Sequence, residues 1–255
     1  MSELKKFWNN NVPMTFYEEN RTYADKRNFR YALQSYMMDV FNFDCFNGKK
    51  VLDLGCGAGI DSVEFASHGA IVTCVDFSKR AVTSTKALFK NAGLKSEIIL
   101  ADAKDLGKIF PSNYFDCVYS FGVLHHIPDI DRVLTGIVKV LKTHGLFMGM
   151  VYNADSLMHA MLLLRAYFLH SHGKYRELPL ELLSEKLTER IFGVPYSHLY
   201  TRTEAMDLFS KYLSNVTVDI YYDVIDVDKQ RKIFFSLNSP HLNLGWHLII
   251  KGEKQ

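Results

Sequence analysis

A glycine-rich segment between two apolar runs is the first feature of this 255-residue sequence that could bind a ligand. Residues 51–54 are apolar apart from Asp53, and directly after them comes Gly55-Cys56-Gly57-Ala58-Gly59. Glycine allows a tight turn with positive φ and lets a ligand approach bare backbone. A helix that starts after such a loop presents unbonded N–H groups. The order of strand, loop and helix therefore predicts a cofactor cradle at residues 55–59.

Three carboxylates stand at the ends of successive apolar runs. Asp53 precedes the loop, Asp76 lies about 20 residues further on, where a ribose-binding acid is expected, and Asp102 follows the third run. Asp53 and Asp102 are placed for an ammonium group and an exocyclic amino group. Each also has a structural interpretation, Asp53 as a cap of nearby amides and Asp102 as a helix cap. A dinucleotide-binding loop would have its third glycine at position 60, where this chain has Ile60, so the spacing disfavours a nicotinamide cofactor.

Alternating strand and helix patterns must position these residues. Strand-length apolar runs occur at 50–54, 71–76, 97–101, 115–120 and 146–152, and helical patterns at 60–67, 78–91 and 131–141. This alternation is typical of βαβ units that build a mostly parallel sheet. Two later runs, 216–224 and 246–251, are expected to form its antiparallel end. We therefore expect an α/β fold with a seven-stranded, mostly parallel sheet flanked by helices.

The length fits one domain of residues 1–255. We expect a helical lid at 1–48, a cofactor-binding core at 49–153, a helical cap at 154–212 and the final strands at 213–255. Helices are predicted in the cap at 157–169 and 180–189. The lid carries aromatic residues that are expected to close over the site, namely Phe16, Tyr17, Tyr23, Phe29, Tyr31 and Tyr36.

The loop with Asp53, Asp76 and Asp102-Ala103 resembles the class I S-adenosylmethionine-dependent methyltransferases. The resemblance implies a Rossmann-like fold with S-adenosylmethionine as cofactor, and Asp102-Ala103 is similar to the pair that recognises adenine. The implied cofactor-binding residues are Asp53, Gly55, Cys56, Gly57, Gly59, Asp76, Phe77, Asp102, Ala103, Ser120 and Phe121. The stretch Leu124-His125-His126-Ile127-Pro128-Asp129, with residues 200–204 and 245–250, is similar to small-molecule methyltransferases related to the quinone-biosynthesis group.

The histidine pair lies where open α/β sheets bind their ligands, beyond the carboxyl end of the fourth strand. Methyl transfer from a sulfonium requires an aligned nucleophile and, for a hydroxyl or amine, removal of a proton. Histidine suits that second task. We expect His125 or His126 to be the base, with a slight preference for His125. The alternative for each is a capping or packing role. No metal site is expected, because the pair and Asp129 lack further ligands.

Candidate acceptor-binding residues come from the lid and the cap. Tyr200 is a candidate catalytic residue, and Tyr31, His198 and Arg202 are candidate substrate-binding residues. Arg202 either pairs with a substrate carboxylate or is solvated at a helix start. A further set of cap residues either packs or touches a membrane surface, and comprises Met158, Met161, Leu162, Leu164, Tyr167 and Phe168.

Composition narrows the function classes. A net charge of +2 is too small for a protein that neutralises many phosphates, so nucleic acid is disfavoured. The four cysteines show no Cys-x-x-Cys spacing and indicate reduced thiols in the cytoplasm. Neither a signal peptide nor a transmembrane segment is expected.

The expected function is transfer of a methyl group to an oxygen, nitrogen or carbon nucleophile of a small molecule. The alternatives are a lipid-like or quinone acceptor at a membrane surface, a nicotinamide-dependent dehydrogenase and a non-catalytic cofactor-binding module. The acceptor, the methylated atom and the oligomeric state stay open.

Overall fold

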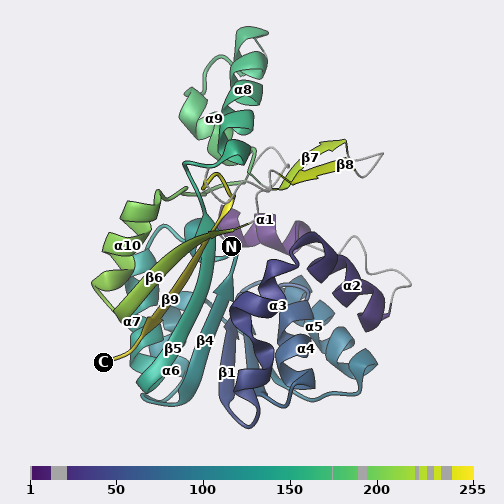
Figure 1. The fold of residues 1–255 in the computed structure, drawn as a ribbon, viewed down its shortest axis with the longest axis vertical. Coiled ribbons are helices and arrows are strands. Elements are labelled where there is room, and N and C mark those ends of the chain that lie inside the picture. The colour runs from purple at the N-terminus through teal and green to yellow at the C-terminus, as the bar shows by residue number, and fades with distance from the viewer. Residues whose placement is uncertain are drawn as a thin grey trace.

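Seven strands form the central sheet of the computed structural model, in the order β3-β2-β1-β4-β5-β9-β6 (Figure 1). Their bounds are β1 (Lys50–Leu54), β2 (Ile71–Asp76), β3 (Glu97–Leu100), β4 (Phe115–Phe121), β5 (Leu141–Tyr152), β6 (Ser214–Tyr221) and β9 (His247–Glu253). β9 runs antiparallel to β5 and β6, whereas the other pairings in this sheet are parallel. The predicted α/β class with a seven-stranded, mostly parallel sheet is confirmed.

The structure describes residues 2–12, 22–173, 175–188, 194–221, 224–228, 233–236 and 243–255. Phe16, Tyr17 and residue 189, which entered the predictions for the lid and the cap, lie outside these ranges.

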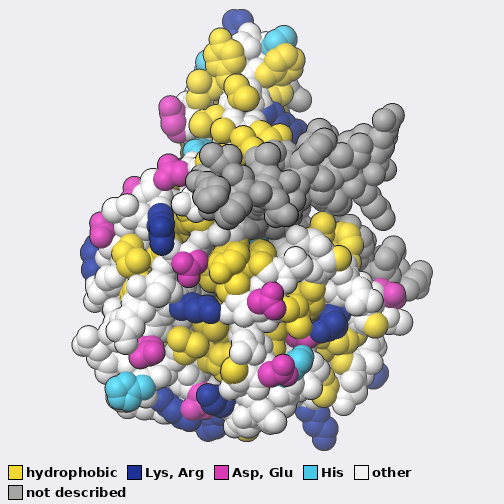
Figure 2. All heavy atoms as spheres, in the orientation of Figure 1, with side chains coloured by type: hydrophobic (Ala, Val, Ile, Leu, Met, Phe, Trp, Pro, Cys, Tyr) yellow, Lys and Arg dark blue, Asp and Glu magenta, His cyan; other side chains and the backbone are white. Residues whose placement is uncertain are grey.

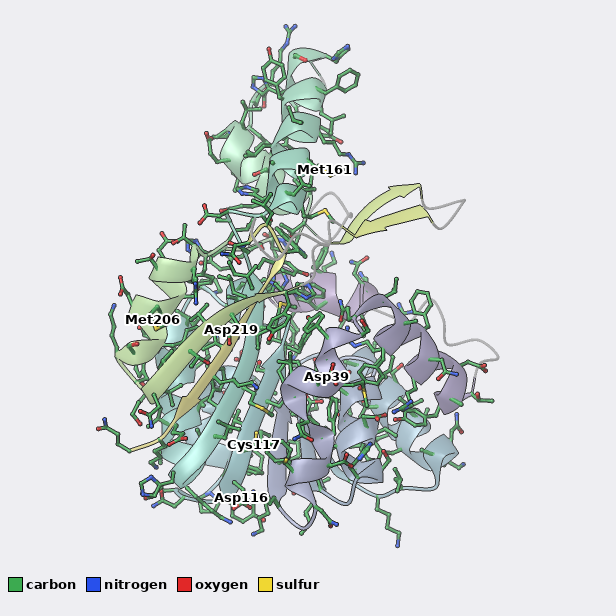
Figure 3. All side chains as sticks on the ribbon, in the orientation of Figure 1. Asp39, Asp116, Cys117, Met161, Met206 and Asp219 are labelled. Atoms are coloured by element: carbon green, nitrogen blue, oxygen red, sulfur yellow. The ribbon has the colours of Figure 1, made fainter. Side chains whose placement is uncertain are left out.

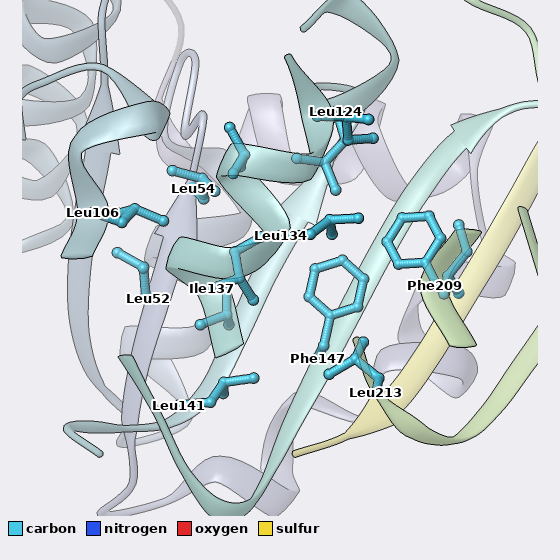
Figure 4. Close-up of a cluster of buried hydrophobic side chains, with 14 of the residues drawn as sticks. Leu52, Leu54, Leu106, Leu124, Leu134, Ile137, Leu141, Phe147, Phe209 and Leu213 are labelled. Atoms are coloured by element: carbon cyan, nitrogen blue, oxygen red, sulfur yellow. The ribbon is translucent and has the colours of Figure 1, made fainter. Parts of the chain in front are cut away.

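Helices cover both faces of the sheet, which explains why the central strands β1, β2, β4 and β5 are mostly buried, whereas the edge strands β3 and β6 are partly exposed. One face packs against α6 (Leu106–Ile109), α7 (Ile130–Val140) and α10 (Arg202–Ser210) through a cluster that includes Leu52, Phe147 and Phe209 (Figure 4). The other face packs against α4 (Ile60–Ser67), α5 (Lys79–Ala92) and α3 (Tyr36–Phe41). Along β1, Val51 belongs to the second cluster and Leu52 to the first, as the alternation of a strand requires.

The first 48 residues contain α1 (Glu3–Asn10), α2 (Tyr23–Leu33), α3 and the 3₁₀ helix η2 (Phe43–Phe46). Between β5 and α10 lie α8 (Leu157–Ser171) and α9 (Leu180–Lys186), which project from one end of the molecule (Figure 1). These two helices pack on each other through Leu162, Ala166 and Leu183, together with Leu187 directly after α9. No helix in the described part of the chain combines the length and the apolar character that a bilayer crossing requires.

Two differences from the predicted elements have local causes. β5 begins at Leu141 instead of residue 146, because Leu141 pairs with Phe115 before an irregularity in the β4–β5 register. The strand predicted at 216–224 is β6, which ends at Tyr221, and Val224 instead begins a separate hairpin of β7 (Val224–Asp228) and β8 (Ile233–Ser236).

Candidate functional site

A cavity of about 300 Å³ lies at the carboxyl edge of the parallel strands. The glycine loop after β1, Asp76 at the end of β2 and Tyr152 at the end of β5 line it. His247 lines it as well, although it is the first residue of β9. An antiparallel strand begins at the edge where its parallel neighbours end, and His247 pairs there with Tyr152.

The glycine loop follows the cavity wall with three residues at positive φ. Gly55, Gly57 and Gly59 have φ of 79°, 55° and 82°. A Cβ at Gly55 would come within 2.3 Å of Val123 Cγ2, so a side chain there would collide with the loop after β4. A Cβ at Gly57 would meet nothing within 4 Å, so its backbone borders open space that a ligand can occupy.

Asp76 is held by the backbone on both of its oxygens. The Gly57 N–H donates to Oδ2 at 3.0 Å and the Ser78 N–H donates to Oδ1 at 2.8 Å. The side chain is buried, and burial raises the pKa of the Asp76 carboxyl, while these backbone hydrogen bonds act to lower it. The carboxylate is therefore fixed in orientation against the loop, with lone pairs left for a ligand hydroxyl.

Asp53 lies under the loop with the Ser62 hydroxyl as its hydrogen-bond donor. It is 3% exposed and lines the cavity. Burial raises the pKa of the Asp53 carboxyl to about 7, and the Ser62 hydrogen bond offsets only part of that rise. A cationic group nearby would favour the ionised form, so this position suits an ammonium ligand.

The remaining predicted cofactor residues divide between the cavity and the sheet. Cys56, Phe77, Asp102, Ala103 and Phe121 line the cavity. Asp102 caps the 3₁₀ helix η3 (Ala103–Asp105), since its Oδ1 accepts the Lys104 N–H at 3.0 Å, and its position in the cavity lining is compatible with a ligand contact as well.

Ser120 is buried and does not line the cavity. Its hydroxyl donates to the Leu54 carbonyl at 3.0 Å, which ties β4 to β1.

A buried ion pair that the sequence analysis missed forms another part of the wall. Arg30 of α2 binds Asp61 of α4 through two hydrogen bonds, of 3.1 Å from Nε and 2.7 Å from Nη2. The Tyr31 and Tyr119 hydroxyls also donate to Asp61, and with Arg30 they keep the pKa of its carboxyl below the usual value despite burial. Arg30, Asp61 and Tyr119 line the cavity, while Tyr31 stands behind them.

Of the two histidines, only His126 lines the cavity. Its Nδ1 lies 3.0 Å from the Tyr196 carbonyl oxygen. A carbonyl only accepts, so Nδ1 carries the proton and Nε2 of a neutral ring has the basic lone pair.

His125 is fully buried, and neither of its ring nitrogens has a hydrogen-bond partner within the described residues. Its ring packs 3.9 Å from that of Tyr152, and burial lowers its pKa well below the usual value.

The candidates from the cap lie outside the cavity lining. Tyr200 is buried, its N–H donates to the Tyr152 carbonyl at 3.0 Å, and burial raises the pKa of its phenol. The His198 N–H donates to the His125 carbonyl at 2.8 Å, which fixes the histidine loop through its backbone. Arg202 is exposed on α10, and its Nε donates to the Val218 carbonyl of β6 at 2.8 Å.

Several further aromatic side chains line the cavity beside His126. They are Trp8, Tyr119, Tyr152 and His247, of which His247 has its Nδ1 2.6 Å from the Tyr36 hydroxyl. We call Trp8, Phe121, His126, Tyr152 and His247 the aromatic half of the cavity, and Asp53, the glycine loop, Asp76 and Asp102 the loop half. No group of three or more potential metal ligands occurs among the residues the structure describes.

Comparison with known proteins gives both a domain match and relatives. Residues 52–149 match a methyltransferase domain family. A ubiquinone biosynthesis O-methyltransferase of Aliivibrio fischeri is 33% identical over 165 residues, which cover 60% of this chain and 70% of that protein. The chain belongs to the class I S-adenosylmethionine-dependent methyltransferases.

Other relatives match over a shorter stretch. The ubiquinone biosynthesis O-methyltransferase of Photobacterium profundum is 33% identical over 116 residues, so this methyltransferase spans about half (49%) of that relative's length. Among solved structures, a methyltransferase from Thermotoga maritima, described as a possible histamine N-methyltransferase, aligns with a TM-score of 0.63 at 15% identity. It covers 99% of this chain and 100% of its own, which shows that the fold is shared.

S-adenosylmethionine is the cofactor of this family, and the loop half fits it. The open space beside Gly57 admits a ligand to the backbone, and the buried carboxylates suit its hydroxyls and its ammonium group.

The loop geometry predicts a loss of binding that is separable from a loss of stability. Gly57→Ala and Gly93→Ala place a Cβ at similar positive φ, 55° and 69°, and neither Cβ meets an atom within 4 Å. Each costs roughly 1–2 kcal/mol of backbone strain. Of these two glycines, Gly57 lines the cavity and Gly93 does not. We therefore expect Gly57→Ala to weaken S-adenosylhomocysteine binding by at least tenfold in calorimetry and Gly93→Ala to leave it unchanged. Equal affinities of the two variants would contradict a ligand path along this loop.

Asp53 predicts a pH dependence of cofactor binding. A cationic ligand lowers the pKa of a neighbouring carboxyl, so below pH 7 binding must displace a proton from Asp53. Affinity for S-adenosylmethionine should therefore rise as pH increases from about 5 to 7, a range in which an α-amino group stays charged. Asp53→Asn should bind more weakly at pH 7 and lose most of this slope, the remainder coming from Asp76, whose pKa burial also raises.

Asp39→Asn is the matched control, because Asp39 is exposed on α3 (Figure 3) and should leave the pH dependence as in the wild type. An unchanged slope in Asp53→Asn would show that another group titrates on binding.

Proposed function

We propose that this chain transfers the methyl group of S-adenosylmethionine to an oxygen, nitrogen or carbon nucleophile of a small-molecule acceptor. One observation carries the proposal: a single cavity contains both the loop half and the aromatic half, so a donor and an acceptor can meet in it. An oxygen nucleophile is favoured, because several relatives are named O-methyltransferases, and His126 in the aromatic half can remove the proton of a hydroxyl.

In this proposal the loop half holds the cofactor. Asp76 accepts its ribose hydroxyls, Asp102 with Ala103 and Phe77 surrounds its adenine, and Asp53 faces its ammonium group. Gly55, Cys56, Gly57 and Gly59 supply backbone, Phe121 supplies a wall, and Ser120 supports that wall by fixing β4 to β1. When bound, the cofactor supplies an electrophilic methyl group on a sulfonium.

The aromatic half receives the acceptor and removes its proton. Aromatic rings on several sides suit a flat apolar molecule. We assign the base to His126, because its Nδ1–H is engaged by the Tyr196 carbonyl and its lone pair is on Nε2. His125 and Tyr200 then support Tyr152 from outside the cavity lining. The His125 ring packs on the Tyr152 ring, and the Tyr200 N–H donates to the Tyr152 carbonyl. Tyr31, His198 and Arg202 support the walls through Asp61, the histidine loop and β6.

Replacing the two histidines separates these roles. His126→Ala should lower kcat by about 10²–10⁴-fold, the usual contribution of a general base, and should leave S-adenosylhomocysteine affinity within about threefold. Added imidazole should restore part of the activity. The measurement is S-adenosylhomocysteine release from a panel of phenols, catechols and small amines.

His125→Leu should keep at least about a third of the activity, because its ring lies outside the cavity lining and makes no hydrogen bond within the described residues. His144→Asn is the control, since His144 is exposed and its φ of 60° is one that asparagine tolerates. A severe loss in His125→Leu with an active His126→Ala would transfer the base to His125. Normal turnover in both would remove the histidine loop from the chemistry.

A lipid-like acceptor at a membrane surface is the second candidate, and an exposed apolar face of α8 favours it. Leu164, Tyr167 and Phe168 are 70%, 61% and 59% exposed, and Figure 2 shows hydrophobic side chains over the projecting helices. Arg165 and Arg176 are exposed near them. Aromatic and apolar groups beside cations are typical of interfacial helices.

On this candidate the protein should sediment with phosphatidylglycerol vesicles, and Leu164→Ser with Phe168→Ser should abolish that binding. Ile71→Ser is the control, because Ile71 is 57% exposed on β2, outside α8 and α9. Absence of sedimentation, or equal loss in the control, would leave a soluble acceptor.

A cytoplasmic location is also part of the proposal. It is supported by the four cysteines, none of which forms a disulfide bond, and Cys117 is buried in β4 (Figure 3).

A further inference from the structure

We infer that Trp8 of α1 is an acceptor-positioning residue, and that Asn9 holds it in place from the cofactor side of the cavity. The inference rests on the proposed function and deepens it, because it names the wall against which the acceptor is oriented.

Helix α1 takes part in the cavity although it ends at Asn10, far before the glycine loop that begins at Gly55. Leu4, Trp8 and Val12 line the cavity, and Val12 is 4% exposed. Leu4 and Trp8 are four residues apart and share one face of α1, and Val12 follows the end of the helix. The neighbouring Phe7 does not line the cavity.

The contact to the acceptor side is made by the Trp8 ring. Its centroid lies 4.8 Å from that of His126, with the two planes at 58°. His126 is itself fixed by the Tyr196 carbonyl. An indole next to the base gives a flat apolar surface at the point where the acceptor must present its nucleophile, so the indole restricts the directions from which a planar molecule reaches Nε2.

The contact to the cofactor side is made by the backbone of Trp8 and by the next residue. The Asn9 Oδ1 accepts the Lys79 N–H at 2.9 Å and the Ser78 hydroxyl at 3.1 Å, and that hydroxyl also lies 3.3 Å from the Trp8 carbonyl. The Ser78 N–H in turn donates to Asp76. Two consecutive residues therefore connect the carboxylate of the loop half to the base of the aromatic half.

The test uses Trp246→Phe as the background, because Trp8 and Trp246 are the two tryptophans and Trp8 then reports alone. S-adenosylhomocysteine should change Trp8 emission. In the S-adenosylhomocysteine complex, phenol, catechol and 1-naphthol serve as probes, and at least one should quench Trp8 further.

In the wild-type background, Trp8→Ala should weaken binding of that probe and raise its KM about tenfold, as expected for the loss of an aromatic contact. It should leave S-adenosylhomocysteine affinity within about threefold, and Trp8→Phe should recover most of the loss. Asn9→Ala should show the same pattern more weakly. Lys6→Ala is the control on the same helix, because Lys6 is exposed and does not line the cavity, and it should behave as the wild type.

The outcomes separate the two proposals. Failure to bind S-adenosylhomocysteine in the wild type would overturn the proposed function itself. Three results would overturn the role of Trp8 alone while cofactor binding stays normal. They are no binding of any probe, unchanged probe affinity in Trp8→Ala, and an equal effect in Lys6→Ala.

Discussion

The close approach of Gly55 to Val123 is the constraint on which the site depends. A Cβ at position 55 would overlap the Val123 side chain, so the loop after β1 and the loop after β4 touch only because residue 55 is glycine. The positive φ of Gly55 also starts the turn that brings the Gly57 N–H to Asp76. The glycine loop and the histidine loop are thus in contact across the sheet edge, and their separation is set by the backbone at Gly55.

Two buried carboxylates at this edge of the sheet, Asp53 and Asp61, differ in how their charge is compensated. Asp61 stays ionised because Arg30 and two tyrosine hydroxyls compensate for its burial. Asp53 receives a hydrogen bond from the uncharged Ser62, and burial raises its pKa to about 7. The two carboxylates line one cavity and differ in their partners. Asp53 is only partly ionised near neutral pH. A cationic ligand would stabilise its ionised form, as Arg30 already stabilises that of Asp61.

The sheet could be predicted from the sequence because its central strands are buried on both faces and form short continuous apolar runs, whereas its helices are buried on one face and show a helical period. The bounds of β1, β2 and α4 agree with the predicted 50–54, 71–76 and 60–67. The site was less accessible. Adjacent strand residues point to opposite faces, so Ser120 binds the Leu54 carbonyl while Phe121 lines the cavity. The sequence carried a signal for His247, because the antiparallel strand expected at 246–251 must begin at the edge where its parallel neighbours end, which brings its first residues to the cavity.

Trp8 and Arg30 were missed for a different reason, because contacts between distant segments of the chain produce no periodic pattern in the sequence. One signal was present: Asp61 and Glu64 stand in the first turns of a helix whose neighbours are apolar, and buried carboxylates need partners. Those partners are Arg30 and Arg27 of α2.

The aromatic half adds a last electrostatic condition. Burial lowers the pKa values of His125 and His247 well below the usual value, so both imidazoles stay neutral at physiological pH. A protonated imidazole at the edge of this cavity would repel a sulfonium, in surroundings where charges are poorly screened. Fully buried rings that resist protonation let histidines stand close to a cationic donor without opposing its binding. The packing of His125 against Tyr152 and the hydrogen bond between His247 and Tyr36 hold both rings in these buried positions, where they add no positive charge beside the cavity.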